Sequence, residues 1–475
     1  MDERDQPTKT MLAAAAGEAM VVDTLGGRMR VRWDEQAQAT PHGQLVFFAE
    51  FLATAGVFDR WVDECPLSYS SPNGSAKRDV LGTLMLGILA AGKRYAHIAR
   101  VQGDAVAARS LGLSGLVSED SVRRALKAID EAAADSWMRQ ALMGSVRDAL
   151  SRPWVLDLDA TIKPLYGRQE GAEVGYNPHK PGRPSHVLHS FIVGNLRLVL
   201  DAVLTSGKQH SSRHGKAALQ RLLDELGGQT PALVRGDCGY GNEDIIDVCE
   251  QRGLAYLLRL RQTANVKRLI ERLFRREGWT RATSLSQGWQ AIEDELRLVG
   301  WSKARRVVVL RRRIRHDVAL QARTANGQLL LALPHDEVQD NTKLWEYTVL
   351  VTNAAYGIEA IGKLYRDRCD CENSFDELKN QWGWSGFTTH DMQRSQIMAR
   401  AVALVYNWWS WYVRAANPGA RREALTSRPL LLAAVGRAAT SGGQTTLYLT
   451  PMHAEVGLIK SMIANVHAAV AHVRR

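Results

Sequence analysis

The sequence predicts an α/β protein whose core is interrupted by a β-rich segment and flanked by helical regions. Three observations predict this class. Apolar residues recur every three or four positions up to about residue 150, a spacing typical of helices. At Pro153 the pattern changes to the alternation typical of strands. A highly charged helix over residues 365–379 then follows late in the chain, after the β-rich residues 266–345.

The composition is that of a globular protein with a net positive charge. At 475 residues the chain should form two to four domains, and its 45% hydrophobic and 23% charged residues are ordinary for soluble proteins. The net charge of +11 indicates a polyanionic partner, nucleic acid first and an anionic membrane surface second. Five scattered cysteines argue against a disulfide framework or a structural zinc site and for a reducing compartment. Without a signal peptide or a clean membrane span, we expect a soluble cytoplasmic protein.

The region up to residue 150 is predicted to be a mostly helical DNA-binding or dimerisation domain. Within it, residues 104–108 and 118–129 indicate a helix-turn-helix, with Ser118 as the N-cap of the second helix. Arg123 and Arg124 lie on that second helix, which suits a recognition helix in a DNA major groove. A helical hairpin with a basic outer face is the alternative.

After Pro153 the expected elements follow in the order strand, two strands joined by a tight turn, helix, strand, helix, strand. This is the order of a ribonuclease H-like α/β core, which the charged helix at 365–379 would complete. The expected ranges are strands 154–160, 187–193 and 197–204, helix 215–226, strand 231–236, helix 242–252 and strand 254–259.

This order divides the chain into five predicted parts. They are the helical domain 1–150, the first part of the ribonuclease H-like catalytic core 151–265, a β-rich insertion domain 266–345, the second part of the core 346–415, and a C-terminal helical region 416–475.

Three acidic residues fall where such a core would bring them together. Asp159 lies on the first strand, Asp237 directly after the fourth, and Glu372 on the late helix. Carboxylates grouped in this way suit two Mg²⁺ ions that promote in-line displacement at a phosphodiester. Asp157 shares the strand face of Asp159, so either residue fits the role of first ligand.

Four functional side chains would share one face of the late helix. Tyr365, Arg368, Glu372 and Lys379 stand at offsets of 0, 3, 7 and 14, which places them within a sector of roughly 60°. Such a face suits a metal ion and a polyanion. A solvated, salt-bridged helix is the alternative.

Together these residues resemble a known family. The segments Asp159-Ala-Thr161 and Arg235-Gly-Asp237, followed by a Tyr-x2-Arg-x3-Glu-x6-Lys signature, resemble the DDE transposases of bacterial insertion sequences over roughly residues 150–415. The resemblance implies that Asp159, Asp237 and Glu372 hold two Mg²⁺ or Mn²⁺ ions, and that Tyr365, Arg368 and Lys379 bind DNA phosphates.

The resemblance also implies a reaction and partners. The family cleaves double-stranded DNA at terminal inverted repeats and joins the 3′ hydroxyl ends to target DNA, generally as a homodimer in a synaptic complex. The protein would then act at the nucleoid in bacterial cytoplasm. Two alternatives remain open: a structure-selective, metal-dependent nuclease of the same fold, and a catalytically silent DNA-binding regulator.

Further DNA contacts are expected outside the signature. Lys180 and Arg183 flank the expected active-site end, where DNA would pass. Some members of the family flip a base onto an aromatic residue of the insertion, and Trp289 is the candidate here. Trp279 and Trp301 are alternatives, and each of the three also fits a core position.

Overall fold

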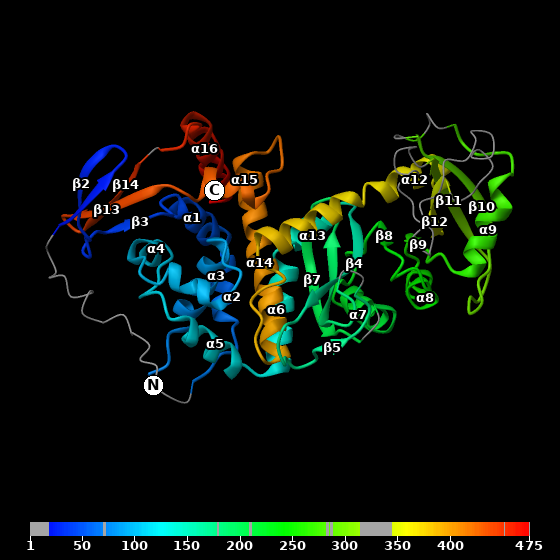
Figure 1. The fold of residues 1–475 in the computed structure, drawn as a ribbon, viewed down its shortest axis with the longest axis horizontal. Helices are drawn as coiled ribbons and strands as arrows, with labels where there is room; N and C mark the ends of the chain where they lie inside the picture. The colour runs from blue at the N-terminus through cyan, green and yellow to red at the C-terminus, as the bar shows by residue number, and fades with distance from the viewer. Residues whose placement is uncertain are drawn as a thin grey trace, which may run out of the picture.

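The chain forms an elongated molecule in which a long central helix separates a helical end from a sheet-containing end, as the computed structural model shows (Figure 1). For residues 211–213 and 369–372 the description is limited to the backbone. The residues described are 19–69, 73–177, 180–208, 211–281, 285, 288–313, 344–450 and 452–474.

The helical end packs around α14 (Met392–Ala416), which is buried along most of its length. Asp104, Ser118 and Asp130 cap α4, α5 and α6 by accepting bonds from backbone N–H groups, so the N-cap predicted at Ser118 is confirmed. The N-terminal elements are α1 (Leu45–Ala55), α2 (Val57–Asp63), α3 (Lys77–Leu89), η2 (Tyr95–Arg100), α4 (Ala105–Ser110), α5 (Glu119–Ala128), α6 (Glu131–Gly144) and η3 (Arg147–Ser151).

A mixed sheet forms the centre, with hydrogen-bonded order β7-β6-β4-β8-β9. The neighbours of β4 differ in direction, because β6 runs antiparallel to it while β8 runs parallel, and β9 is parallel to β8. The α/β class predicted from the sequence is therefore confirmed. The strands are β4 (Val155–Pro164), β5 (Glu173–Val174), β6 (Pro184–Val193), β7 (Leu198–Ser206), β8 (Leu233–Gly236) and β9 (Tyr256–Arg259).

Alternation along β4 sends its side chains to two different layers. Leu156 and Leu158 pack with α7 (Ser211–Leu226) and α8 (Glu243–Gln251) on one face of the sheet. Asp157 and Asp159, at the alternate positions, belong to the opposite face. On that face α14 packs against β7, and α13 (Cys369–Gln381) packs against α14.

The strands expected in a separate β-rich insertion instead continue the central sheet. On its side away from β8, β9 pairs antiparallel with β12 (Trp345–Thr352). The strands β11 (Arg305–Arg313) and β10 (Gln290–Leu296) follow outward from β12. The backbone groups that β9 presents on its outer side bind β12, so this edge of the core is paired. A helix, α9 (Ala264–Phe274), precedes these strands. The division of the chain into five domains stays a prediction.

The single helix predicted over 365–379 is two helices. α12 (Ile358–Arg366) ends and α13 begins at Cys369, with Asp367 and Arg368 between them. The N–H of Arg368 bonds to the carbonyl of Tyr365, three residues back, so the chain tightens here without leaving the right-handed helical region. The predicted continuous helix is therefore interrupted between Tyr365 and the rest of the signature, and the common face stays a prediction.

The C-terminal region is not wholly helical, which corrects the sequence prediction. Between α15 (Ala424–Leu431) and α16 (Val456–Val473) lies a hairpin of β13 (Val435–Ser441) and β14 (Gln444–Thr450). Gly442 and Gly443 at its tip have positive φ, as a tight hairpin turn requires. β13 also pairs with β3 (Ala39–Thr40), so both ends of the chain meet in one small sheet.

Within the described residues, α16 is a helix long and apolar enough to cross a membrane, with a mean hydropathy of 1.3. Its Ile459, Met462, Val466 and Val470 are buried in the same core cluster as α14. A core helix passes this test equally well.

Acid should destabilise the sheet through His189 on β6. Its ring nitrogens contact the hydroxyls of Tyr240 and Thr205 at 3.2 and 3.0 Å. Burial, aided by nearby His214, lowers the pKa of His189 to about 4. Stability from neutral His189 is fully present above its unfolded pKa of about 6.5 and is lost as pH falls toward 4.

The predicted loss is about 2 kcal/mol in the free energy of unfolding between pH 6.5 and 5. Denaturant titration at both pH values should show it for the wild type, and a His189→Asn variant should show a smaller change. An equal pH dependence in both proteins would contradict this account.

Candidate functional site

Asp159 is held in a well-defined position near the middle of β4. Its carboxylate accepts a hydrogen bond from its neighbour's amide, Ala160 N–H, at 2.7 Å and pairs with Arg368 at 2.5 Å. Its carbonyl accepts bonds from Tyr240 and Ser190 on neighbouring elements. Burial, countered by Arg368 and reinforced by Asp237, raises the pKa of Asp159 to about 6. The site therefore disfavours a second negative charge unless a cation is present.

Asp237 follows β8, the strand that runs parallel to β4. Because parallel neighbours end at the same edge of a sheet, this places Asp237 beside Asp159, as its effect on the pKa of Asp159 requires. Its Oδ1 accepts the N–H of Gly239 at 2.9 Å. Asp237 also lines a cavity of about 160 Å³, together with Ala160, Ile162, Tyr176, Val187, Gly207, Lys208, Cys238, Gly239 and Arg261.

Three residues of the predicted signature surround these carboxylates. Arg368 is buried and pairs with Asp159. Lys379 on α13 is close enough for Asp159 to raise its pKa, although burial lowers that pKa overall. Tyr365 at the end of α12 is half-buried, and burial raises its pKa to about 12, with nearby Arg368 and Arg259 opposing the shift.

Glu372 belongs to α13, three residues after the helix begins. Its side chain lies outside the described residues, and its predicted role as the third carboxylate stays a prediction. Among the side chains that are described, no group of three or more His, Cys, Asp or Glu residues lies together.

Asp157 has a different environment from Asp159. It is fully buried, and its two oxygens accept from Nε and Nη2 of Arg235 at 2.6 and 2.7 Å. Arg235 also donates to the Leu364 carbonyl of α12. A Cβ on Gly194 would come within 2.0 Å of the Asp157 carboxylate, which leaves no space for solvent there. Asp157 therefore joins the sheet to α12 and faces no cavity.

The residues present fit a divalent cation. Asp159 and Asp237 supply hard oxygen donors, and the nearby Asp237 helps to raise the pKa of Asp159. Arg368 already pairs with Asp159, which shows that this carboxylate accepts a cationic partner. Of the three predicted ligands, Asp159 and Asp237 have described side chains, whereas Glu372 is described by its backbone alone.

A basic groove of about 590 Å³ runs from the helical end to the end of β4. Its basic lining residues are Lys93, Arg94 and Arg123, and Tyr166 lines it as well. The other lining residues are Tyr95, Ala96, Glu119, Pro164, Leu165, Gln169, Gly383, Ser385, Gly386, Phe387 and Thr388. Buried Lys163 of β4 donates to the Gly386 carbonyl at 2.7 Å, which fixes the loop after α13 against the sheet.

The residues predicted to contact DNA lie at different places relative to this groove. Lys180 and Arg183 both lie over the ring of Tyr166, at 5.0 and 4.9 Å from its centroid. Arg123 lines the groove but pairs with Asp120 at 2.8 Å. Arg124 is 73% exposed and is not among the groove's lining residues. Sequence reasoning did not identify Tyr166 as a groove residue, because only the fold brings it beside Arg123 of α5.

Trp289 has no free face for a nucleobase, which corrects its prediction as a stacking platform. It is 8% exposed and packs in a core cluster with Leu310 and Ile361. The guanidinium of Arg312 lies 4.9 Å from its ring centroid. The alternatives Trp279 and Trp301 are likewise covered, by Arg311 and Arg305.

A family model described as "Transposase DDE domain group 1" matches residues 74–471. The chain belongs to this family. DDE transposases generally use divalent metal ions, in agreement with the oxygen donors of Asp159 and Asp237.

Among solved structures, the chain is similar to the piggyBac transposase in a synaptic complex with hairpin DNA determined by cryo-EM. The identity is 11%, the match covers 92% of this chain and 82% of that chain, and the TM-score is 0.37. A search of curated proteins found no match.

Proposed function

We propose that this DDE-family protein is an active DNA transposase, which cleaves DNA at transposon terminal repeats and joins the 3′ hydroxyl ends to target DNA. The observation that carries the proposal is the convergence of Asp159 and Asp237 from parallel strands β4 and β8, with Arg368 and Lys379 beside them. The strand order β7-β6-β4-β8-β9 supports a ribonuclease H-like core for this chemistry.

Asp159, Asp237 and Glu372 would hold the metal, as two Mg²⁺ or Mn²⁺ ions. When bound, such ions supply an activated oxygen nucleophile and stabilisation of the leaving oxygen. We assign the first ligand to Asp159 rather than Asp157, because Asp157 is fully buried on Arg235 whereas the side chain of Asp159 keeps 17% exposure.

The remaining site residues bind and orient the DNA. Arg368 and Lys379 provide charge-assisted hydrogen bonds to phosphates, and Tyr365 provides a neutral one. Arg368 keeps Asp159 paired until substrate and cation arrive. Burial of Asp159 lowers the local dielectric and strengthens each of these contacts.

We infer that the DNA flanking the cleaved end follows the basic groove. Lys93, Arg94 and Arg123 line one side, and Tyr166 with Lys180 and Arg183 continues the charge toward β4. Phosphates tracking this line would pass from α5 to the catalytic carboxylates. We further propose a homodimer that acts on the bacterial nucleoid, as synapsis of two ends requires two active sites.

An in vitro reaction with Mg²⁺, the element's terminal repeats and a supercoiled target tests this function. Joined product is the expected result. Nicking without joining would indicate a nuclease of the same fold, and binding without cleavage would indicate a silent DNA-binding regulator.

A further inference from the structure

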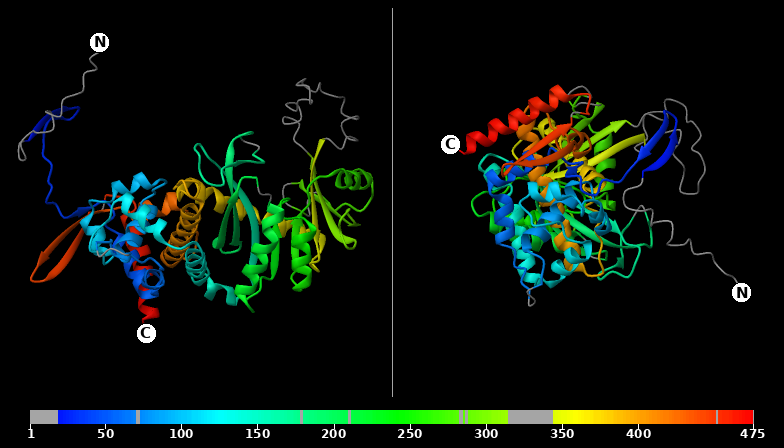
Figure 2. Two further views of the ribbon diagram at one scale, coloured as in Figure 1. Left: turned by 90° about the horizontal axis from the view of Figure 1, so that it is seen from below. Right: turned by 90° about the vertical axis from the view of Figure 1, so that its left-hand side faces the viewer.

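The N-terminal residues form a two-stranded ribbon that projects from the rest of the molecule (Figures 1 and 2). β1 (Met20–Thr24) pairs antiparallel with β2 (Gly27–Val31) through a turn at Leu25 and Gly26, and this pair is a sheet of its own. All ten strand residues are exposed. The ribbon also lies before residue 74, where the family match begins.

Strand alternation and register give the ribbon two chemically different faces. Directly paired residues share a face, and Arg30 pairs with Val21 while Arg28 pairs with Asp23. Arg32 continues the arginine series at the next alternate position. The opposite face is apolar and consists of Met20, Val22, Met29 and Val31, which belong to the cross-strand pairs Met20 with Val31 and Val22 with Met29.

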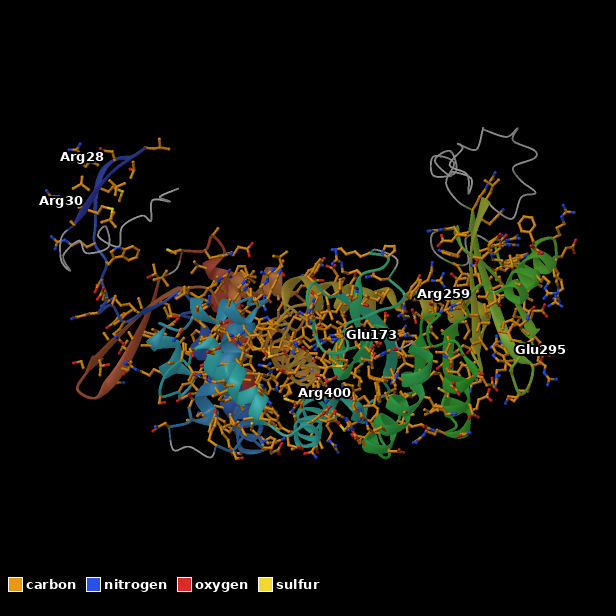
Figure 3. All side chains as sticks on the ribbon, turned by 60° about the horizontal axis from the view of Figure 1, so that its bottom comes forward. Arg28, Arg30, Glu173, Arg259, Glu295 and Arg400 are labelled. Atoms are coloured by element: carbon orange, nitrogen blue, oxygen red, sulfur yellow. The ribbon has the colours of Figure 1, made fainter. Side chains whose placement is uncertain are left out.

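The arginine face carries an excess of positive charge. Its one carboxylate, Asp23, pairs with Arg28 at 2.9 Å, and both partners are more than 70% exposed. Figure 3 shows Arg28 and Arg30 on the ribbon, far from the labelled residues of the central sheet. Apart from the Arg28–Asp23 pair, no ion pair of these guanidinium groups is found within the described residues.

The shape and length of the ribbon fit a DNA groove. A two-stranded antiparallel ribbon is one of the two protein elements that the major groove of B-DNA admits. The stretch from Arg28 to Arg32 spans about 14 Å, and one DNA strand carries a phosphate about every 3.4 Å along the axis. An isolated ribbon is also marginally stable in water, so a bound partner would stabilise it.

We propose that this ribbon is a DNA-binding arm, which places Arg28, Arg30 and Arg32 against double-stranded DNA outside the active-site groove. The inference rests on the proposed function for its substrate class. The apolar face could instead serve a protein partner. Three arginines against the single carboxylate of Asp23 leave this face with a net positive charge, which favours a polyanion, because a protein surface would have to supply carboxylates to match it.

The test compares two variants that lose the same charge. One is Arg28→Gln/Arg30→Gln/Arg32→Gln in the ribbon. The control is Lys267→Gln/Arg268→Gln/Arg297→Gln, whose residues are exposed on and near α9 and β10 at the other end of the molecule (Figure 1). The dissociation constant of the full-length protein for a duplex carrying the terminal repeat is measured over a salt series, with circular dichroism as the folding check.

The ribbon variant should bind at least about tenfold more weakly at low salt, and the slope of log affinity against log salt should fall by about 2–3. The control variant should lose far less DNA affinity. Equal losses in the two variants, or no loss in the ribbon variant, would overturn the proposal. A duplex that the wild type does not bind would instead overturn the proposed function.

A third variant addresses the protein-docking alternative. Val22→Thr/Val31→Thr keeps strand propensity but makes the apolar face polar. Under the proposal, the particle mass in light scattering stays that of the wild type. A shift to a smaller particle, combined with unchanged DNA binding in the arginine variant, would make the ribbon a protein-docking arm and refute the proposal.

Discussion

Replacing Arg235 with leucine should lower the free energy of unfolding by about 3–5 kcal/mol, because the variant leaves a buried carboxylate without its cation. Asp157 is 0% exposed and receives two of the guanidinium's N–H groups. The same arginine bonds to the Leu364 carbonyl, so its loss also loosens α12 from the sheet. Denaturant unfolding followed by circular dichroism measures the effect.

The matched control for Arg235→Leu is Arg252→Leu. Arg252 also pairs with an aspartate, Asp224, at 2.7 Å, but its partner is 66% exposed. Exposed ion pairs contribute about 0–1 kcal/mol to the free energy of unfolding, so the stability of this variant should remain close to that of the wild type. A double variant, Asp157→Leu/Arg235→Leu, should recover part of the loss, since it removes the buried charge together with its partner. Equal losses from Arg235→Leu and Arg252→Leu would contradict a structural role for Asp157.

Replacing Asp159 with asparagine should reduce DNA cleavage by at least about 10³-fold while the protein stays folded, because a metal ligand is lost without a change in shape. Burial already disfavours the charge of Asp159, whose pKa is raised to about 6, and the asparagine oxygen can still accept from Arg368. The variant should also bind Mn²⁺ more weakly, which isothermal titration calorimetry measures without DNA.

Binding of the terminal repeat should survive in Asp159→Asn, since the proposed phosphate contacts are those of Arg368, Lys379 and the basic groove. Duplex binding by fluorescence anisotropy checks this point. Retained cleavage, or Mn²⁺ binding equal to that of the wild type, would remove Asp159 from the site.

The sequence could not distinguish Asp157 from Asp159, because the two share a strand face and differ only in what packs against them. The choice depends on Arg235, which lies in register with Asp157 across a parallel pair. Nothing in local sequence predicts this pairing. By contrast, the strands themselves and the position of Asp237 after β8 follow from alternation and turn residues, which act locally.

Other differences also have tertiary causes. The β-rich texture of residues 266–345 predicted strands where β10 and β11 lie, but it did not predict β12, and the attachment of these strands to β9 depends on which backbone edge is available. The hairpin of β13 and β14 is largely exposed, and its covered face carries only Gly436, Ala438, Leu447 and Leu449, so its alternation gave a weak strand signal. Aromatic residues such as Trp289 fit a core and a stacking platform equally well until burial is known.

The central claim is that Asp159 and Asp237 form one metal-dependent site for DNA strand transfer. Its most direct test is the Mg²⁺-dependent joining of a pre-cut transposon end to a supercoiled target, by the wild type and by Asp237→Asn. The account predicts joined product with the wild type, and end binding without product with the variant. Equal amounts of joined product from both proteins would contradict it.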